Sequence, residues 1–106
     1  MFKITQGKGV NIKFENGWSI SIQWGPGNYC HARQDGFLDA PEDTETWFAA
    51  VGEHGSLTAE IAVRNPNGGM IGLEGVPHCG EDSVKGWLTP NQVLDIMNWV
   101  VARKPA

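Results

Sequence analysis

The sequence predicts an α+β domain in which a small antiparallel β-sheet of about five strands is packed on one face by a single C-terminal α-helix. Short segments that alternate apolar and polar residues are separated by turns rich in glycine, of which the chain has 14. The last apolar segment instead follows the 3.6-residue period of a helix. With 106 residues, of which 41% are hydrophobic, the chain suffices for one core, so we expect residues 1–106 to form a single domain.

Strict alternation predicts the first three strands of the sheet, because side chains on a strand point to opposite faces in turn. These segments are residues 2–5, 10–14 and 18–24, and the third alternates over all seven positions. We therefore expect half-buried antiparallel strands with one apolar face.

The connection at residues 15–17 decides how the second and third strands pair. A two-residue loop would place Phe14 opposite Ser19 and so set the apolar residues of one strand against the polar residues of the other. A three-residue loop places Phe14 opposite Trp18, with Gly17 in the left-handed conformation of a type I turn with a bulge. The predicted register also pairs Ile12 with Ile20 and Val10 with Ile22.

A second hairpin is expected from residues 57–64 and 70–73, which flank an Asn-Pro-Asn-Gly-Gly turn at 65–69. Residues 70–73 would then be the fifth strand. Residues 41–51 fit either a short buried strand or a helical turn, and the pattern does not choose between them.

The helix is expected from about Pro90 to Arg103. Thr89 is a good N-cap, proline suits the first helical position, and Gln92 completes a capping box. A helical projection places six apolar residues on one stripe that would face the sheet. They are Val93, Leu94, Ile96, Met97, Val100 and Val101.

Trp99 falls on the polar side of this helix, one turn from Asp95 and from Arg103. Either another loop covers the indole, or the indole is an exposed contact for a partner or for a second copy in a homodimer. We expect Trp99 to be at least partly exposed and to lie at a contact.

Charge is distributed unevenly along the chain. The formal net charge of −4 disfavours direct binding of nucleic acid, which needs a basic face. Residues 35–82 hold ten acidic residues and one basic residue, and half of the acids fall within residues 35–45. This stretch is either a solvated surface or a face that meets a basic surface on another protein. The candidate contact residues are Asp35, Asp39, Glu42, Asp43 and Glu45.

The reactive side chains give no sequence pattern typical of a catalytic or metal site. They are Cys30, His31, His54, His78 and Cys79. Directly adjacent residues in an extended strand point to opposite sides, which disfavours a zinc site, and no nucleophile motif surrounds either cysteine. We expect no catalytic residue, metal or cofactor, and no membrane contact, since no apolar run approaches the roughly 18 residues of a membrane span. Whether the Cys-His pairs converge in space is left open.

Three segments resemble small accessory proteins encoded by tailed bacteriophages. They are residues 23–30 (QWGPGNYC), 59–63 (AEIAV) and 84–90 (VKGWLTP). The resemblance implies a protein that acts in the host cytoplasm and disables a defence component there, in the manner of an anti-CRISPR protein. The first hypothesis is a non-catalytic inhibitor whose acidic face meets a basic surface on a host defence protein or complex. The alternative is a binding protein that sequesters a nucleotide immune signal, holding its phosphates through Lys8, Lys13, Arg33 or Lys85.

Overall fold

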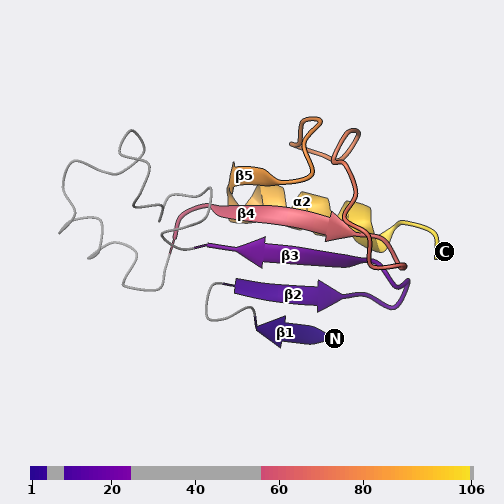
Figure 1. Ribbon diagram of the computed structural model, residues 1–106. Helices are drawn as coiled ribbons and strands as arrows, with labels where there is room; N and C mark the ends of the chain where they lie inside the picture. The colour runs from indigo at the N-terminus through magenta and orange to yellow at the C-terminus, as the bar shows by residue number, and fades with distance from the viewer. Residues whose placement is uncertain (5–8, 25–55, 106) are drawn as a thin grey trace, which may run out of the picture.

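A computed structural model describes residues 1–4, 9–24 and 56–105, and these form an antiparallel sheet with one C-terminal helix packed on it (Figure 1). Along the chain the elements are β1 (Phe2–Ile4), β2 (Gly9–Lys13), β3 (Ser19–Gln23), β4 (Ala59–Arg64), β5 (Lys85–Leu88) and α2 (Pro90–Val101). The five strands lie in the order β1-β2-β3-β4-β5, and every neighbouring pair is antiparallel. The predicted α+β class is confirmed.

The β2–β3 hairpin has the predicted register. Val10 pairs with Ile22, and Ile12 pairs with Ile20. At the turn the Phe14 N–H donates to the Trp18 carbonyl at 2.9 Å. Gly17 has φ +88°, so glycine takes the left-handed position that the three-residue loop requires. Matching the apolar rows of two strands was therefore enough to predict their pairing.

The prediction of a fifth strand at residues 70–73 is wrong. Met70 forms only an isolated bridge with Arg64, after which the chain leaves the sheet and buries Leu73 in the core. The fifth strand is β5, which pairs with β4 across a register shift. Trp87 in β5 has φ +60°, so the strand is irregular and its sequence lacks the alternation that marks a regular strand.

The start of α2 follows the prediction. Thr89 Oγ1 accepts from the Gln92 N–H at 3.3 Å, and Gln92 Oε1 accepts from the Thr89 N–H at 2.9 Å, which completes the capping box with Pro90 in the first turn. The helix ends at Val101 with Ala102 as the C-cap, two residues before the expected end at Arg103.

The buried side of α2 is rotated relative to the predicted stripe. Val93, Ile96 and Val100 are buried, but Leu94 and Val101 are 54% and 52% exposed. The difference arises because Trp99 packs against the core on the opposite flank of the helix. An indole buries more area than a leucine or a valine side chain, so its contacts favour the rotated position.

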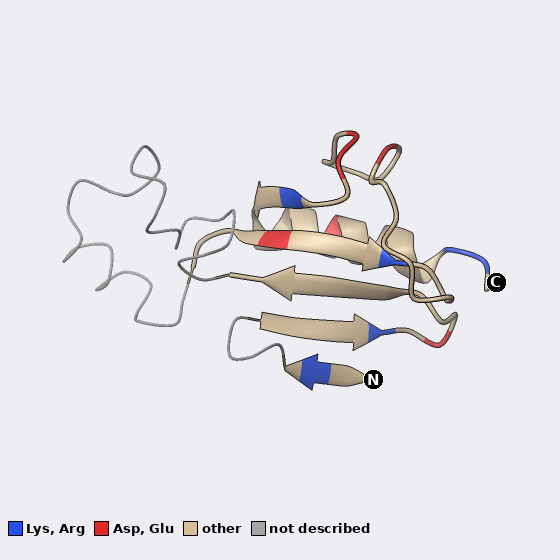
Figure 2. Ribbon diagram, in the orientation of Figure 1, with Lys and Arg blue, Asp and Glu red and all other residues tan. Residues whose placement is uncertain are grey.

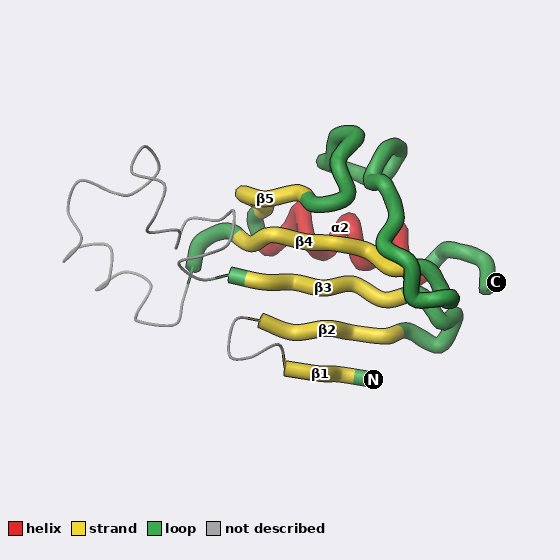
Figure 3. Tube along the Cα trace, viewed as in Figure 1, coloured by secondary structure: helices red, strands yellow, loops and turns green. Residues whose placement is uncertain are grey.

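The core lies between α2 and the middle of the sheet, with a contribution from the loop between β4 and β5. Its buried members are Ile20, Ile61, Val63, Leu73, Val76, Leu88, Val93, Ile96 and Val100. The helix packs across β3 and β4, while β1 and β2 extend beyond it (Figure 3). The sheet is therefore wider than the helix that covers it.

Candidate functional site

The five acidic contact residues of the sequence hypothesis, Asp35, Asp39, Glu42, Asp43 and Glu45, lie outside the described residues. The described part of the chain is balanced in charge, with six basic and six acidic side chains. The net charge of −4 therefore belongs to residues 5–8, 25–55 and 106, which hold two basic residues and six acidic ones.

Acidic side chains also gather in the loop between β4 and β5, which Figure 2 shows in red. Glu74, Glu81 and Asp82 are all exposed there. No other segment among the described residues brings three exposed acids so close in sequence. This loop carries the same type of charge as residues 35–45. It therefore serves as the comparison for them.

Trp99 is half-buried and makes its contacts within the chain. Its ring meets that of Trp18 edge to face, with centroids 6.2 Å apart and planes at 89°. The Arg103 guanidinium lies 4.1 Å from the Trp99 ring centroid, and Arg103 Nε donates to the Trp99 carbonyl at 2.9 Å. Trp18, from the turn between β2 and β3, and Arg103, one helical turn further along the chain, thus contact the indole.

His78 and Cys79 lie in the loop between β4 and β5, whereas Cys30, His31 and His54 fall outside the described residues. His78 Nε2 is 2.8 Å from Asp95 Oδ2 on α2, so this contact ties the loop to the helix. His78 has φ +65°, a left-handed conformation that few side chains adopt. Within the described ranges, no group of three or more His, Cys, Asp or Glu side chains could hold a metal ion.

The Cys79 side chain is partly buried and packs against the core. Burial raises the pKa of its thiol, and the positive charge of Lys85 opposes this only in part. A raised pKa keeps the thiol protonated near neutral pH, whereas a nucleophilic cysteine needs a lowered one. The environment of Cys79 is that of a structural residue.

The face of the sheet opposite α2 is polar, and we call it the polar sheet face. Cross-strand partners share a face, so Lys3, Asn11 and Ser21 form one polar row across β1, β2 and β3. A hollow of about 450 Å³ lies on this face, with Arg64 and Glu60 also in its lining. Cations beside amide and hydroxyl groups are suited to a ligand that bears phosphate.

The sequence did not predict this hollow, and it suggested other cations for phosphate binding. Lys8 and Arg33 lie outside the described residues, and neither Lys13 nor Lys85 lines the hollow. The cations that do line it are Lys3 on β1 and Arg64 on β4, and the strands β2 and β3 lie between them. Pairing each predicted strand with its neighbours would have placed Lys3 beside Asn11, but the β3–β4 pairing was not predicted.

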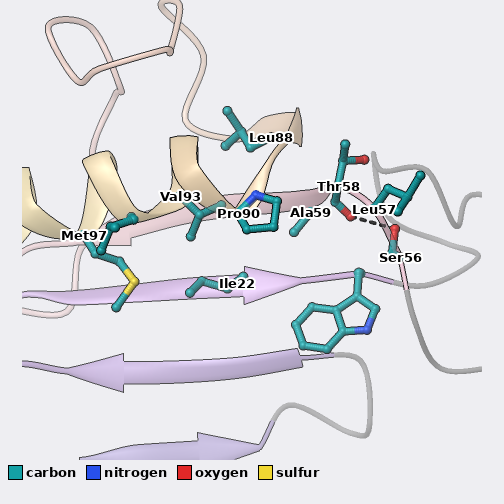
Figure 4. A pocket seen from close by; sticks show the side chains of 11 residues that line it. Ile22, Ser56, Leu57, Thr58, Ala59, Leu88, Pro90, Val93 and Met97 are labelled. Atoms are coloured by element: carbon teal, nitrogen blue, oxygen red, sulfur yellow. Dashed lines mark hydrogen bonds between the residues drawn. The ribbon is translucent and has the colours of Figure 1, made fainter. Parts of the chain in front are cut away.

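An apolar pocket of about 390 Å³ lies where the first turns of α2 cross the ends of β3 and β4 (Figure 4). Ile22, Val93 and Met97 line it, and Ser56 Oγ donates to the Thr58 carbonyl at 2.7 Å on its rim. Trp24, another lining residue, is the last described residue before residues 25–55. Trp24 and Ser56 are the described residues that flank residues 25–55 in the sequence.

Comparison of the chain with family models, with curated proteins and with solved structures finds no match in any of the three. In the parts of the chain that the structure describes, no helix has the length and apolar character needed to cross a membrane. Functional inference for this chain therefore rests on its own residues.

Proposed function

We propose that the protein is a non-catalytic inhibitor that binds a basic surface on a component of host anti-phage defence. The observation that carries this proposal is the concentration of negative charge in one stretch of an otherwise balanced chain. Five acids fall within residues 35–45, while the described residues have no net charge. The resemblance of three sequence segments to phage accessory proteins is the reason for expecting a partner in host defence.

An acidic stretch of this kind suits the occlusion of a nucleic-acid channel. Such channels are lined with lysine and arginine, and complementary potentials steer two proteins together and fix their relative orientation. The attraction acts over a Debye length of about 10 Å at 0.1 M salt, so binding should weaken as salt is added. The raised pKa of the Cys79 thiol disfavours nucleophilic catalysis by that residue.

Plating efficiency of phage on a defended host tests the proposal. Expression of the wild-type protein should raise plating, and the triple variant Asp39→Lys/Glu42→Lys/Asp43→Lys should lose this effect. The matched control reverses three exposed acids of the β4–β5 loop, which changes the net charge by the same amount. The control substitutions are Glu74→Lys, Glu81→Lys and Asp82→Lys.

The control should still raise plating, because its reversed charges lie in a different segment. Equal loss in both variants would mean that only overall charge matters, and equal protection in both would mean that residues 35–45 are a solvated surface. Either outcome would overturn the proposed contact. Thermal unfolding of all three proteins checks that each variant is folded.

The hollow on the polar sheet face favours a second candidate function, the sequestration of a nucleotide signal. Lys3 and Arg64 would hold the phosphates, and Asn11 and Ser21 would contact the remainder of the ligand. Protein purified from infected cells should then release a nucleotide on heating, and Lys3→Gln/Arg64→Gln should release none. Absence of any nucleotide from the wild-type protein would reject this candidate.

A further inference from the structure

Two apolar rows run across the helix-bearing face of the sheet and continue beyond the helix. The register places Phe2, Ile12, Ile20 and Val63 in one row. It places Ile4, Val10, Ile22 and Ile61 in the other. Direct cross-strand partners share a face, so all eight side chains point to the side on which α2 lies.

Exposure rises along each row with distance from the helix. Ile20 and Val63 are fully buried beneath α2, Ile12 is half-buried on β2, and Phe2 on β1 is 79% exposed. In the second row the exposed end is Ile4, at 76%. Both rows are thus apolar over their whole length, which is typical of a sheet face that is covered. Among the described residues, however, nothing covers their β1 end.

The flank of α2 that faces this area is apolar as well. Leu94 and Val101 are each more than half exposed, and Val101 lines a hollow together with Phe14, which follows β2. We call the surface made by Phe2, Ile4, Leu94 and Val101 the open apolar face. Soluble domains rarely expose a contiguous apolar surface of this kind unless it is a contact surface.

The charges of β1 and β2 argue for a face-to-face contact. Lys3, Asn11 and Lys13 alternate with the apolar row members, so they point to the polar sheet face and the two rows carry no charge. Glu15, which lines the hollow beside Val101, lies outside the rows. Interface cores are depleted of charge in the same way. Two copies can therefore bring these rows together without opposing like charges.

Pairing of two copies through the free edge of β1 is disfavoured by contrast. Met1 and Lys13 exchange backbone hydrogen bonds of 2.7 and 2.8 Å, so in the alternating antiparallel pattern the N–H and C=O groups of Phe2 and Ile4 point to the free edge. The symmetric register that pairs all three residues of β1 would place Lys3 directly opposite its own counterpart. Like charges opposed across a strand pair are destabilising.

We propose that the protein forms a homodimer in which the open apolar faces of two copies pack together about a two-fold axis. Full burial of each exposed side chain removes on the order of 100 Å² from water. The open apolar face has four such side chains in each copy, so the eight side chains of a dimer account for about 800 Å². Specific interfaces begin near about 1,200 Å² in total, and the partly buried Val10, Ile12 and Met97, with the backbone between them, supply the remainder. This contact differs from a dimer built on Trp99, whose ring is engaged by Trp18 and Arg103.

Sedimentation equilibrium of the full chain over micromolar to submillimolar concentrations tests the proposal. The wild-type protein should approach twice the 11.6 kDa mass of the chain. Phe2→Ser/Ile4→Ser should remain monomeric over the same range. The matched control is Met70→Ser, which removes a side chain that is 45% exposed and lines the hollow on the polar sheet face.

The control should associate as the wild type does. A second variant, Leu94→Ser/Val101→Ser, repeats the test on the helix flank without altering the sheet, and circular dichroism verifies that each protein is folded. A wild-type protein that stays monomeric at every concentration would overturn the proposal, since the face would then be covered by something other than a second copy. Dimers that persist in both double variants would overturn it as well.

Discussion

Replacement of Asn16 by alanine should destabilise the protein at the end of its C-terminal helix, although the carbonyls that Asn16 contacts are more than 80 residues away in the chain. Asn16 lies in the β2–β3 turn, and its Nδ2 donates toward the carbonyls of Val100, Val101 and Arg103 at 2.9, 3.2 and 3.0 Å. The last carbonyls of a helix have no partner within the helix, so a side chain that donates to them acts as a cap. Asn16 Oδ1 also accepts from the Trp18 N–H at 3.1 Å.

The magnitude follows from the number of bonds that can form at once. The amide has two N–H hydrogens for three carbonyls, and its oxygen accepts one further bond. Each bond contributes about 0.5–1.5 kcal/mol net, so Asn16→Ala should lower the free energy of unfolding by about 2–3 kcal/mol. Asn16→Asp should cost more, because a carboxylate has no hydrogen to donate and would face the negative end of the helix dipole.

Urea unfolding followed by tryptophan fluorescence measures this change in free energy. Asn67→Ala, at an exposed position in the turn after β4, is the control and should alter stability by less than about 0.5 kcal/mol. A stability of Asn16→Ala equal to that of the control would refute the view that the turn caps the helix. So would an Asn16→Asp variant as stable as the wild type.

Two further predictions test the rotated helix and the environment of the thiol. Ile96→Ala should lower the free energy of unfolding by about 2–5 kcal/mol because Ile96 is fully buried, whereas Leu94→Ala should cost less than about 1 kcal/mol; similar losses in urea unfolding would contradict the observed helix face. Cys79, in a variant whose other cysteine is serine, should be alkylated more slowly in the native than in the unfolded protein at pH 8–9, because its raised pKa keeps the thiol protonated over a range where a free thiol ionises. Equal rates in native and unfolded protein would show that the thiol is not protected.

Local sequence signals predicted the parts of the fold that depend on near neighbours. The β2–β3 register followed from matching apolar rows across a three-residue loop, and the start of α2 followed from Thr89, Pro90 and Gln92. In both cases the decisive interactions join residues close in the chain. Alternation and capping are properties of such short segments.

Features that depend on distant parts of the chain could not be predicted in this way. The irregular β5 lacks alternation because it bulges against β4, so its sequence resembles a loop. The rotation of α2 depends on the contact between Trp99 and Trp18 and on the donation from Asn16, which join the helix to a turn near the other end of the chain. A helical projection treats the helix alone and contains no information about either contact.

The candidate site, too, has one feature that the sequence alone predicts and one that requires the fold. The excess of acid in residues 35–45 can be counted from the sequence, but its place in the fold cannot. The hollow on the polar sheet face depends on bringing Lys3 and Arg64 onto one surface, which requires the complete strand order. Charge was thus predictable as a quantity along the chain, whereas its arrangement in space required the sheet.

The proposed function depends on the binding of residues 35–45 to a basic protein surface. Its most direct test is affinity capture of the tagged protein from infected host cells at low and at high salt, with the two charge-reversal triples alongside. We predict a co-purifying protein that is retained at low salt and released at high salt. It should be lost from Asp39→Lys/Glu42→Lys/Asp43→Lys and kept by the triple in the β4–β5 loop. Capture that is the same for both variants and at both salt concentrations would contradict the proposal.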